Sequence, residues 1–210
     1  MRFLFLFFAS LHASQCIFTP PPGWEIAQLK TPSPYVKIGF IGRGTSEFRP
    51  SMNLSTEEVD VSLKEYVKAV KELHLADPAA TWRDLGKLSM KAGTGRLVEM
   101  SGASPYGETK ILQAFFVKSE MAYILTAAIL KEDFPKIQAE LLKSFQSLNV
   151  LDDLWAPAPD LFASLGRGKQ EEEWQKVQDT VKSLPELGPY WQFLVLQEGR
   201  SKIYPNGDNL

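Results

Sequence analysis

The stretch from Lys110 to Leu130 constrains the fold of this chain more than any other, because it is apolar on both of its faces. Lys110–Val117 is rich in Ile, Phe and Val, Lys118-Ser119-Glu120 interrupts the run, and Met121–Leu130 resumes it without a charge. Two apolar runs separated by a short polar break predict a β-hairpin. In Met121–Leu130, one alternating set reads Met, Tyr, Leu, Ala, Ile, and the other reads Ala, Ile, Thr, Ala, Leu.

An antiparallel pair with one face in water alternates apolar and polar residues, and this hairpin does not. Burying a Leu or Phe side chain contributes about 1.5–3 kcal/mol, so a wet face would cost on the order of 10 kcal/mol. That cost is comparable with the total stability of a domain. We therefore expect helices on both sides of a central hairpin. One of them begins at Asp133, after which Phe134, Ile137, Leu141 and Phe145 recur at helical spacing.

The rest of the first 150 residues alternates strand patterns with one further helix. Strands are predicted at Trp24–Ala27, Tyr35–Ile41, Ser51–Val61, Lys87–Met90 and Arg96–Met100. Ser62 and Glu65 form an S-x-x-E capping box, which predicts a helix start. Its apolar stripe is Leu63, Tyr66, Val67, Val70 and Leu73. We expect Ser101–Gly107 to be the loop into the hairpin. This order indicates an α+β fold with an antiparallel sheet.

Several short motifs make residues 18–150 resemble the PsbP/Mog-like family. The matching motifs are Gly23-Trp24, Ser62-Leu63-x-x-Tyr66, Tyr123-Ile124-Leu125-Thr126-Ala127, Asp133-Phe134-Pro135-Lys136 and Lys143-Ser144-Phe145. The resemblance implies an α/β/α sandwich, an antiparallel sheet with helices on both faces. The family includes a photosystem accessory subunit, a Ran-GTPase-binding protein and bacterial envelope lipoproteins. These proteins share a scaffold rather than a reaction, so the resemblance implies a binding module and no specific activity.

The N-terminus predicts export. Arg2 precedes the uncharged run Phe3–Leu11 and a small, polar segment, which is typical of a signal peptide over residues 1–15. Cys16, the only cysteine, follows directly, as in bacterial lipoproteins whose cysteine is acylated. Ala13-Ser14-Gln15-Cys16 departs from that pattern at Gln15. Two interpretations stay open: membrane attachment through a lipid on Cys16, or simple secretion. Either form is expected in the periplasm or anchored on the envelope.

The last quarter of the chain predicts a helical appendage over residues 161–210, after a Pro-rich linker at 151–160. Helices are expected at Asp160–Leu165, at Glu171–Leu184 and from Tyr190 onward. Five aromatic residues concentrate in this quarter: Trp155, Trp174, Tyr190, Trp191 and Phe193. They form either the core of the helical pair or, in part, an exposed partner-binding patch, because Trp and Tyr dominate interface hot spots.

No enzyme signature is present, and we expect no catalytic residue, metal or cofactor. His74 is the only histidine beyond the predicted signal peptide, which excludes zinc sites built from His and Cys. Gly166-Arg167-Gly168-Lys169 lacks the spacing and the Ser/Thr of a P-loop. Glu171-Glu172-Glu173 could bind calcium, but acids are also favoured in the first turn of any helix. A net charge of −2 gives no basic field for nucleic acid.

The sequence thus favours an exported, non-enzymatic binding or assembly module that contacts an envelope protein. One alternative is a small-ligand carrier or carboxylate-based enzyme with a cleft between sheet and appendage. Another is that the helical appendage alone recruits a partner.

Overall fold

In the computed structural model of the chain, residues 15–27, 33–44 and 47–205 are described. They belong to two compact units, which we describe one at a time. The sheet unit is Phe18–Asn149, and the helical unit joins Met1–Ile17 with Val150–Leu210, of which residues 15–17 and 150–205 are described. The signal peptide predicted over residues 1–15 lies outside the described residues except for Gln15. No described helix is both long and apolar enough to cross a membrane.

The described part of the sheet unit contains a seven-stranded antiparallel sheet, as expected. Its spatial order is β2 (Glu25–Ile26), β3 (Val36–Ile41), β4 (Ser51–Glu58), β8 (Met121–Leu130), β7 (Gly107–Lys118), β6 (Gly93–Ser104) and β5 (Arg83–Met90). The predicted hairpin is β7–β8, and it occupies the centre of the sheet. Lys118 pairs with Met121, and Ser119 and Glu120 between them adopt positive φ of 51° and 60°. This is the two-residue turn whose twist matches that of the strands.

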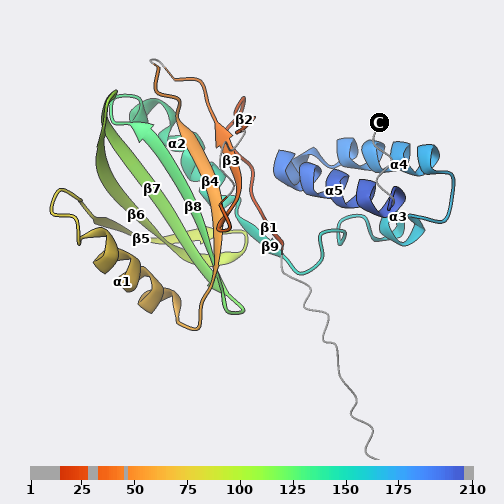
Figure 1. Cartoon of the computed structure of the whole chain (residues 1–210), viewed down its shortest axis with the longest axis horizontal. Coiled ribbons are helices and arrows are strands. Elements are labelled where there is room, and N and C mark those ends of the chain that lie inside the picture. Colours follow the sequence, from red (N-terminus) through yellow and green to blue (C-terminus); the bar gives the residue numbers. More distant parts are fainter. Residues whose placement is uncertain (1–14, 28–32, 45–46, 206–210) are drawn as a thin grey trace, which may run out of the picture. The chain divides into compact units, whose positions relative to one another are not determined.

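Helices α1 (Leu63–His74) and α2 (Phe134–Gln146) lie on opposite faces of the sheet, which we call the α1 face and the α2 face (Figure 1). On the α2 face the side chains of Leu112, Leu125 and Ile129 are fully buried, and so are Leu141 and Phe145 of α2. The expectation of helices on both sides of the hairpin is confirmed.

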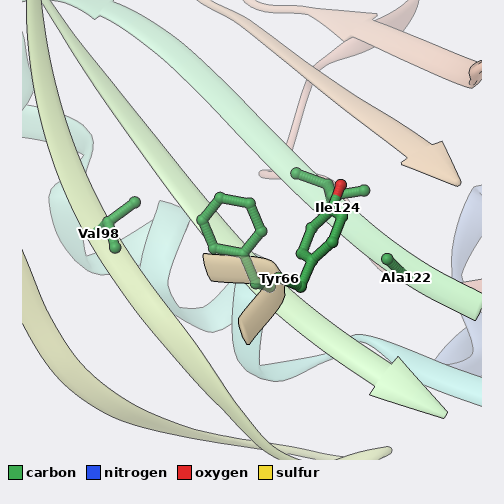
Figure 2. Packing of buried hydrophobic residues seen from close by; sticks show 5 residues of the cluster. Tyr66, Val98, Ala122 and Ile124 are labelled. Atoms are coloured by element: carbon green, nitrogen blue, oxygen red, sulfur yellow. The ribbon is translucent and has the colours of Figure 1, made fainter. Parts of the chain in front are cut away.

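The α1 face is covered over only part of its area. Figure 2 shows Tyr66 of α1 beside Val98, Ala122 and Ile124, and these side chains form one buried cluster. Elsewhere on this face, on β4, β7 and β8, hydrogen-bonded polar side chains lie among apolar ones such as Ile111 and Ala128, and all of these are half-buried. Gln113 Nε2 donates to Thr126 Oγ1 at 3.1 Å, and Ser55 Oγ donates to Asn53 Oδ1 at 3.3 Å. These groups satisfy one another, so this part of the face is stable without a helix above it.

The loop predicted at Ser101–Gly107 is wrong, because β6 and β7 continue through it. The ladder runs without interruption to the pair Ser104–Gly107, and Pro105-Tyr106 makes the turn. Ser104 Oγ donates to the Gly107 carbonyl oxygen at 2.9 Å and so ties the two strand ends together. Outside the core these strand ends carry polar residues, so they lack the apolar alternation on which the strand prediction depends.

Two details of the helices also differ from prediction. The sequence pattern puts Leu73 on the apolar stripe of α1, yet this residue is 79% exposed. Leu73 lies in the last turn of α1, and the predicted stripe is at least half-buried only from Leu63 to Val70. Asp133 stands at the N-cap of α2 but makes no side-chain cap bond; its carboxylate accepts from Lys136 Nζ at 2.6 Å instead.

The helical unit contains α3 (Pro159–Ser164), α4 (Gln170–Ser183), the 3₁₀ turn η1 (Pro185–Leu187) and α5 (Gly188–Ile203); at its start β1 (Gln15–Ile17) pairs with β9 (Asn149–Leu151). Gly199 of α5 faces α4 at close range, because a Cβ there would lie 3.2 Å from Val177 Cγ1. The segment predicted as a linker, 151–160, includes the buried residues Leu154 and Trp155 and the start of α3.

Candidate functional site

A groove of about 570 Å³ lies within the sheet unit, between one flank of α1 and the neighbouring strands β5 and β6. Leu63, Val67 and Trp82 supply its apolar surface. All three are only half-buried in the structure. The groove is therefore an apolar hollow that the described part of the sheet unit leaves open.

The local sequence of α1 creates the helical wall. Ser62 and Glu65 complete the capping box in both directions: Ser62 N donates to Glu65 Oε2 at 3.0 Å, and Glu65 N donates to Ser62 Oγ at 3.3 Å. Hydrogen bonds from Ser62 lower the pKa of Glu65, so its carboxylate stays charged and keeps the cap closed.

The two flanks of α1 have different roles. Tyr66 turns toward the sheet, where its ring packs against Phe115 at 6.0 Å and its hydroxyl donates to Glu57 at 2.7 Å. Burial raises the pKa of Tyr66, so the hydroxyl remains a donor. The groove residues lie on the neighbouring flank, where Leu63 and Val67 are one turn apart and Lys64, Lys68 and Lys71 follow one another at steps of one turn.

A β-bulge shapes the opposite wall. The register of β5 against β6 shifts between Asp84 and Gly86, and Gly86 adopts φ +98°. The extra residue brings Asp84 and Lys87, three positions apart, onto the same groove wall. Gly86 N donates to Asp84 Oδ1 at 2.9 Å, which holds the carboxylate beside the bulge.

The rim of the groove is basic. Its cations are Lys64, Lys68, Lys71, Lys87 and Arg96, and Asp84 is the one acid among the described lining residues. Asp84 is bound by the guanidinium of Arg96, through Nε at 3.0 Å and through Nη2. Hydrogen bonding from Arg96, with help from the Gly86 N–H, lowers the pKa of Asp84. Four lysines thus face an apolar floor with little negative charge among them.

The five aromatic residues singled out from the sequence are divided between core and surface of the helical unit. Trp155, Tyr190 and Trp191 are buried, and Trp191 Nε1 donates to the Leu154 carbonyl oxygen at 3.0 Å. Burial raises the pKa of Tyr190 to about 12. Trp174 is half-buried and Phe193 is 42% exposed. Only these last two side chains are available for an external partner.

Cys16 lies in β1 with 5% of its surface exposed, and burial raises the pKa of its thiol. Acylation would put a lipid on a sulfur that is buried here, so a lipid-anchored form would differ from this structure around β1. Lipidation of Cys16 stays a prediction.

The Gly166-Arg167-Gly168 segment binds an anion from its own chain, which sequence reasoning missed. The backbone N–H groups of these three residues donate to the Glu173 carboxylate at 2.7, 2.8 and 2.5 Å. Glu173 is buried, and these hydrogen bonds lower its pKa. A Gly-x-Gly turn followed five residues later by an acid in the first turn of a helix was the available signal. Glu173 thus has a structural role here.

His74 closes the connection between α1 and β5. Its Nε2 lies 3.2 Å from the Thr81 carbonyl oxygen, and its ring centroid lies 6.1 Å from that of Trp82. Among the residues that the structure describes, no three His, Cys, Asp or Glu side chains are grouped so as to hold a metal ion.

Neither a protein-family model nor a curated protein matches this chain. Several solved structures do match it. LpqN of Mycobacterium tuberculosis, described as involved in cell envelope biogenesis, is similar with a TM-score of 0.51 at 10% identity, over 69% of this chain and 87% of that one. CyanoP, the cyanobacterial PsbP of Synechocystis, has a TM-score of 0.46 at 13% sequence identity, and the match covers 68% of this chain and 95% of that one. The Ran-binding protein Mog1p of Saccharomyces cerevisiae has a TM-score of 0.45 at 16% sequence identity, and the match covers 66% of this chain and 96% of that one. The likeness to LpqN confirms the antiparallel α+β sandwich, and the chain has the PsbP/Mog-like fold.

Proposed function

We propose that this protein is an exported, non-enzymatic binding module of the cell envelope, which contacts a protein partner through the groove between α1 and β5–β6. The observation that carries the proposal is the open apolar floor of Leu63, Val67 and Trp82 under a basic rim. Ligands and partners bind preferentially in hollows with an apolar lining and a few charged groups at the edge.

The titratable groups of the groove favour binding over catalysis. Asp84 is engaged by Arg96, and its lowered pKa keeps it charged rather than ready to donate a proton. General acid–base catalysis needs a group whose pKa lies near the working pH. The remaining charged groups of the rim are lysines and Arg96, which suit recognition of negative charge.

An envelope location has two supports. The sequence of residues 1–15 is typical of a secretory signal peptide. LpqN, whose fold is similar, is described as involved in cell envelope biogenesis. Attachment through a lipid on Cys16 belongs to the same proposal.

Site-specific photocrosslinking in intact cells tests the proposed function. A photoreactive amino acid replaces Lys68 on the groove flank of α1, and a control replaces Glu140, an exposed residue of α2. Position 68 should give a discrete protein adduct in the envelope fraction, and position 140 should not. Equal labelling from both positions, or no labelling from position 68, would show that the groove is not the binding site.

A second candidate is that the helical unit recruits the partner, because Phe193 is exposed on α5 and Trp174 is half-buried on α4. In that case a crosslinker at position 193 gives the adduct, and Phe193→Ser abolishes partner binding without changing the fold. The further alternative, a ligand carrier or enzyme with a cleft between the sheet and the appendage, stays a prediction.

A further inference from the structure

We infer that the groove binds an acidic amphipathic protein segment, in which large apolar side chains on one face are flanked by Asp and Glu. The inference rests on the proposed function, because it presumes that the groove is the binding site, and it adds the chemistry of the partner.

The charges of the groove carry the first step. Five cations and one acid line a hollow on a chain whose net charge is −2, so the basic character is local. Arg96 is engaged by Asp84, which leaves the four lysines. Lys68 lies 3.7 Å from Glu72, but both side chains are more than 60% exposed and such a pair is weak. A partner with carboxylates would therefore find four weakly paired cations.

The arrangement of these cations carries the second step. Lys64, Lys68 and Lys71 follow one flank of α1, with about one turn between them. Lys87 and Arg96 form a cross-strand pair on the opposite wall. Leu63, Val67 and Trp82 line the same groove as the two rows of cations. A ligand that satisfies both features must have an apolar face with acids on either side of it.

The shape of the groove separates a protein segment from other anions. A small anion needs donors that converge on one point, whereas these cations lie on two separate walls. A bilayer would have to reach an apolar floor that lies in a hollow beside a helix. A helix of the partner can enter such a hollow and place its apolar face on the floor, which is a common mode of peptide recognition.

The edge of the sheet argues for a helix rather than an added strand. β5 is one of the two edge strands of the described sheet, and its bulge at Asp84 and Gly86 interrupts the regular row of backbone groups. Bulges and charges on an edge strand oppose pairing with a further strand. A bound helix would instead lie beside α1 and extend the helical layer over β5 and β6.

Fluorescence anisotropy on the full chain tests the inference with three labelled peptides. Each has about 14 residues, which spans about 21 Å as a helix. The first has Leu and Trp on one face and Glu elsewhere, the second replaces every Glu by Lys, and the third keeps the Glu but scatters the apolar residues. The first peptide should bind, and its affinity should fall at least about tenfold between roughly 50 and 500 mM salt, because exposed charges are screened. The second and third should bind at least about tenfold more weakly.

Matched variants locate the binding. Lys71→Glu should weaken the first peptide at least about tenfold. Lys143→Glu is its control, because Lys143 is likewise a basic residue in the last turn of a helix of the sheet unit, and α2 lies on the opposite face. Both changes disturb a helix dipole to the same extent, but only the first changes the groove.

Three results would overturn the inference: equal binding of the Glu and Lys peptides, equal effects of Lys71→Glu and Lys143→Glu, or binding of phosphatidylglycerol vesicles that depends on Lys71 as strongly as peptide binding does. A groove that crosslinks a protein through position 68 but prefers the Lys peptide would refute the acidic partner and leave the proposed function standing. Absence of the adduct at position 68 would refute the proposed function itself.

Discussion

Glu173 shows how much one side chain can do for local structure. Its buried carboxylate accepts three backbone N–H groups from the exposed turn Gly166-Arg167-Gly168. Oriented backbone N–H groups of this kind form an anion-binding concavity. Here the anion is covalently part of the next helix, so the turn and the first turn of α4 are held together.

This contact predicts a pH-dependent stability. The pKa of Glu173 is lower in the folded chain than its ordinary value, so its contribution is present above about pH 4.3, the value for an unperturbed Glu. The contribution is lost as the pH falls through the lower, folded pKa. Glu173→Gln should reduce the melting temperature of the helical unit near pH 7, and the difference from wild type should shrink toward pH 3.

Differential scanning calorimetry at several pH values measures this effect. Glu172→Gln is the control, because Glu172 is exposed and its partner Lys169, at 3.3 Å, is exposed too. A Glu173→Gln penalty that is the same at every pH would contradict the role assigned to the charge.

Trp191 gives a second prediction at the scale of one residue. Its indole N–H donates to the Leu154 carbonyl oxygen inside the helical unit, and its side chain has no exposed surface. Trp191→Phe leaves that carbonyl oxygen without its donor, and an unsatisfied buried group costs about 1–3 kcal/mol. Urea unfolding should show a lower midpoint with an unchanged m-value. Phe193→Leu, two positions further along α5 on an exposed residue, should leave the midpoint close to that of wild type.

At the scale of the element, the capping box of α1 connects stability to binding. Ser62→Ala removes the side-chain acceptor for Glu65 N and should cost about 1 kcal/mol. Since α1 forms one wall of the groove, the variant should also bind the Glu peptide more weakly. Ser62→Thr should keep both properties close to those of wild type, because its hydroxyl can accept from Glu65 N and donate to the Glu65 carboxylate as Ser62 does. Loss of stability without any loss of binding would show that the first turn of α1 does not shape the site.

The same element explains what can be predicted from the sequence. The start of helix α1 is predictable because capping depends on residues three positions apart. The central hairpin is predictable because strands with apolar residues on both faces have to lie in the middle of a sheet that is covered on both sides. The strand ends that reach the turn at Pro105-Tyr106 escape prediction, because outside the core they carry no apolar alternation. The groove cannot be predicted from the sequence either. It depends on a bulge that brings Asp84 and Lys87 onto one wall, and patterns in a single sequence do not reveal such a register shift.

At the scale of the whole molecule, the division at residue 150 predicts an independently folding sheet unit. Residues 18–149 contain their own core, including the fully buried Phe115, Leu125 and Phe145. Limited proteolysis of the full chain should release a stable fragment close to these boundaries. The fragment should unfold cooperatively and keep the affinity of the full chain for the Glu peptide. A fragment that folds but loses the envelope partner would favour recruitment by the helical unit instead.

The partly uncovered α1 face has a consequence for behaviour at high concentration. Where no helix of the sheet unit lies above the strands, Gln113 bonds Thr126 and Ser55 bonds Asn53. The Gln113–Thr126 pair thus lies between the half-buried pair Ile111–Ala128 and the buried pair Phe115–Ile124. A wide, flat and apolar sheet surface would stack on a neighbouring molecule and promote aggregation. These polar pairs keep part of that area hydrated, so replacing them by aliphatic residues would enlarge the apolar surface on which neighbouring molecules could stack.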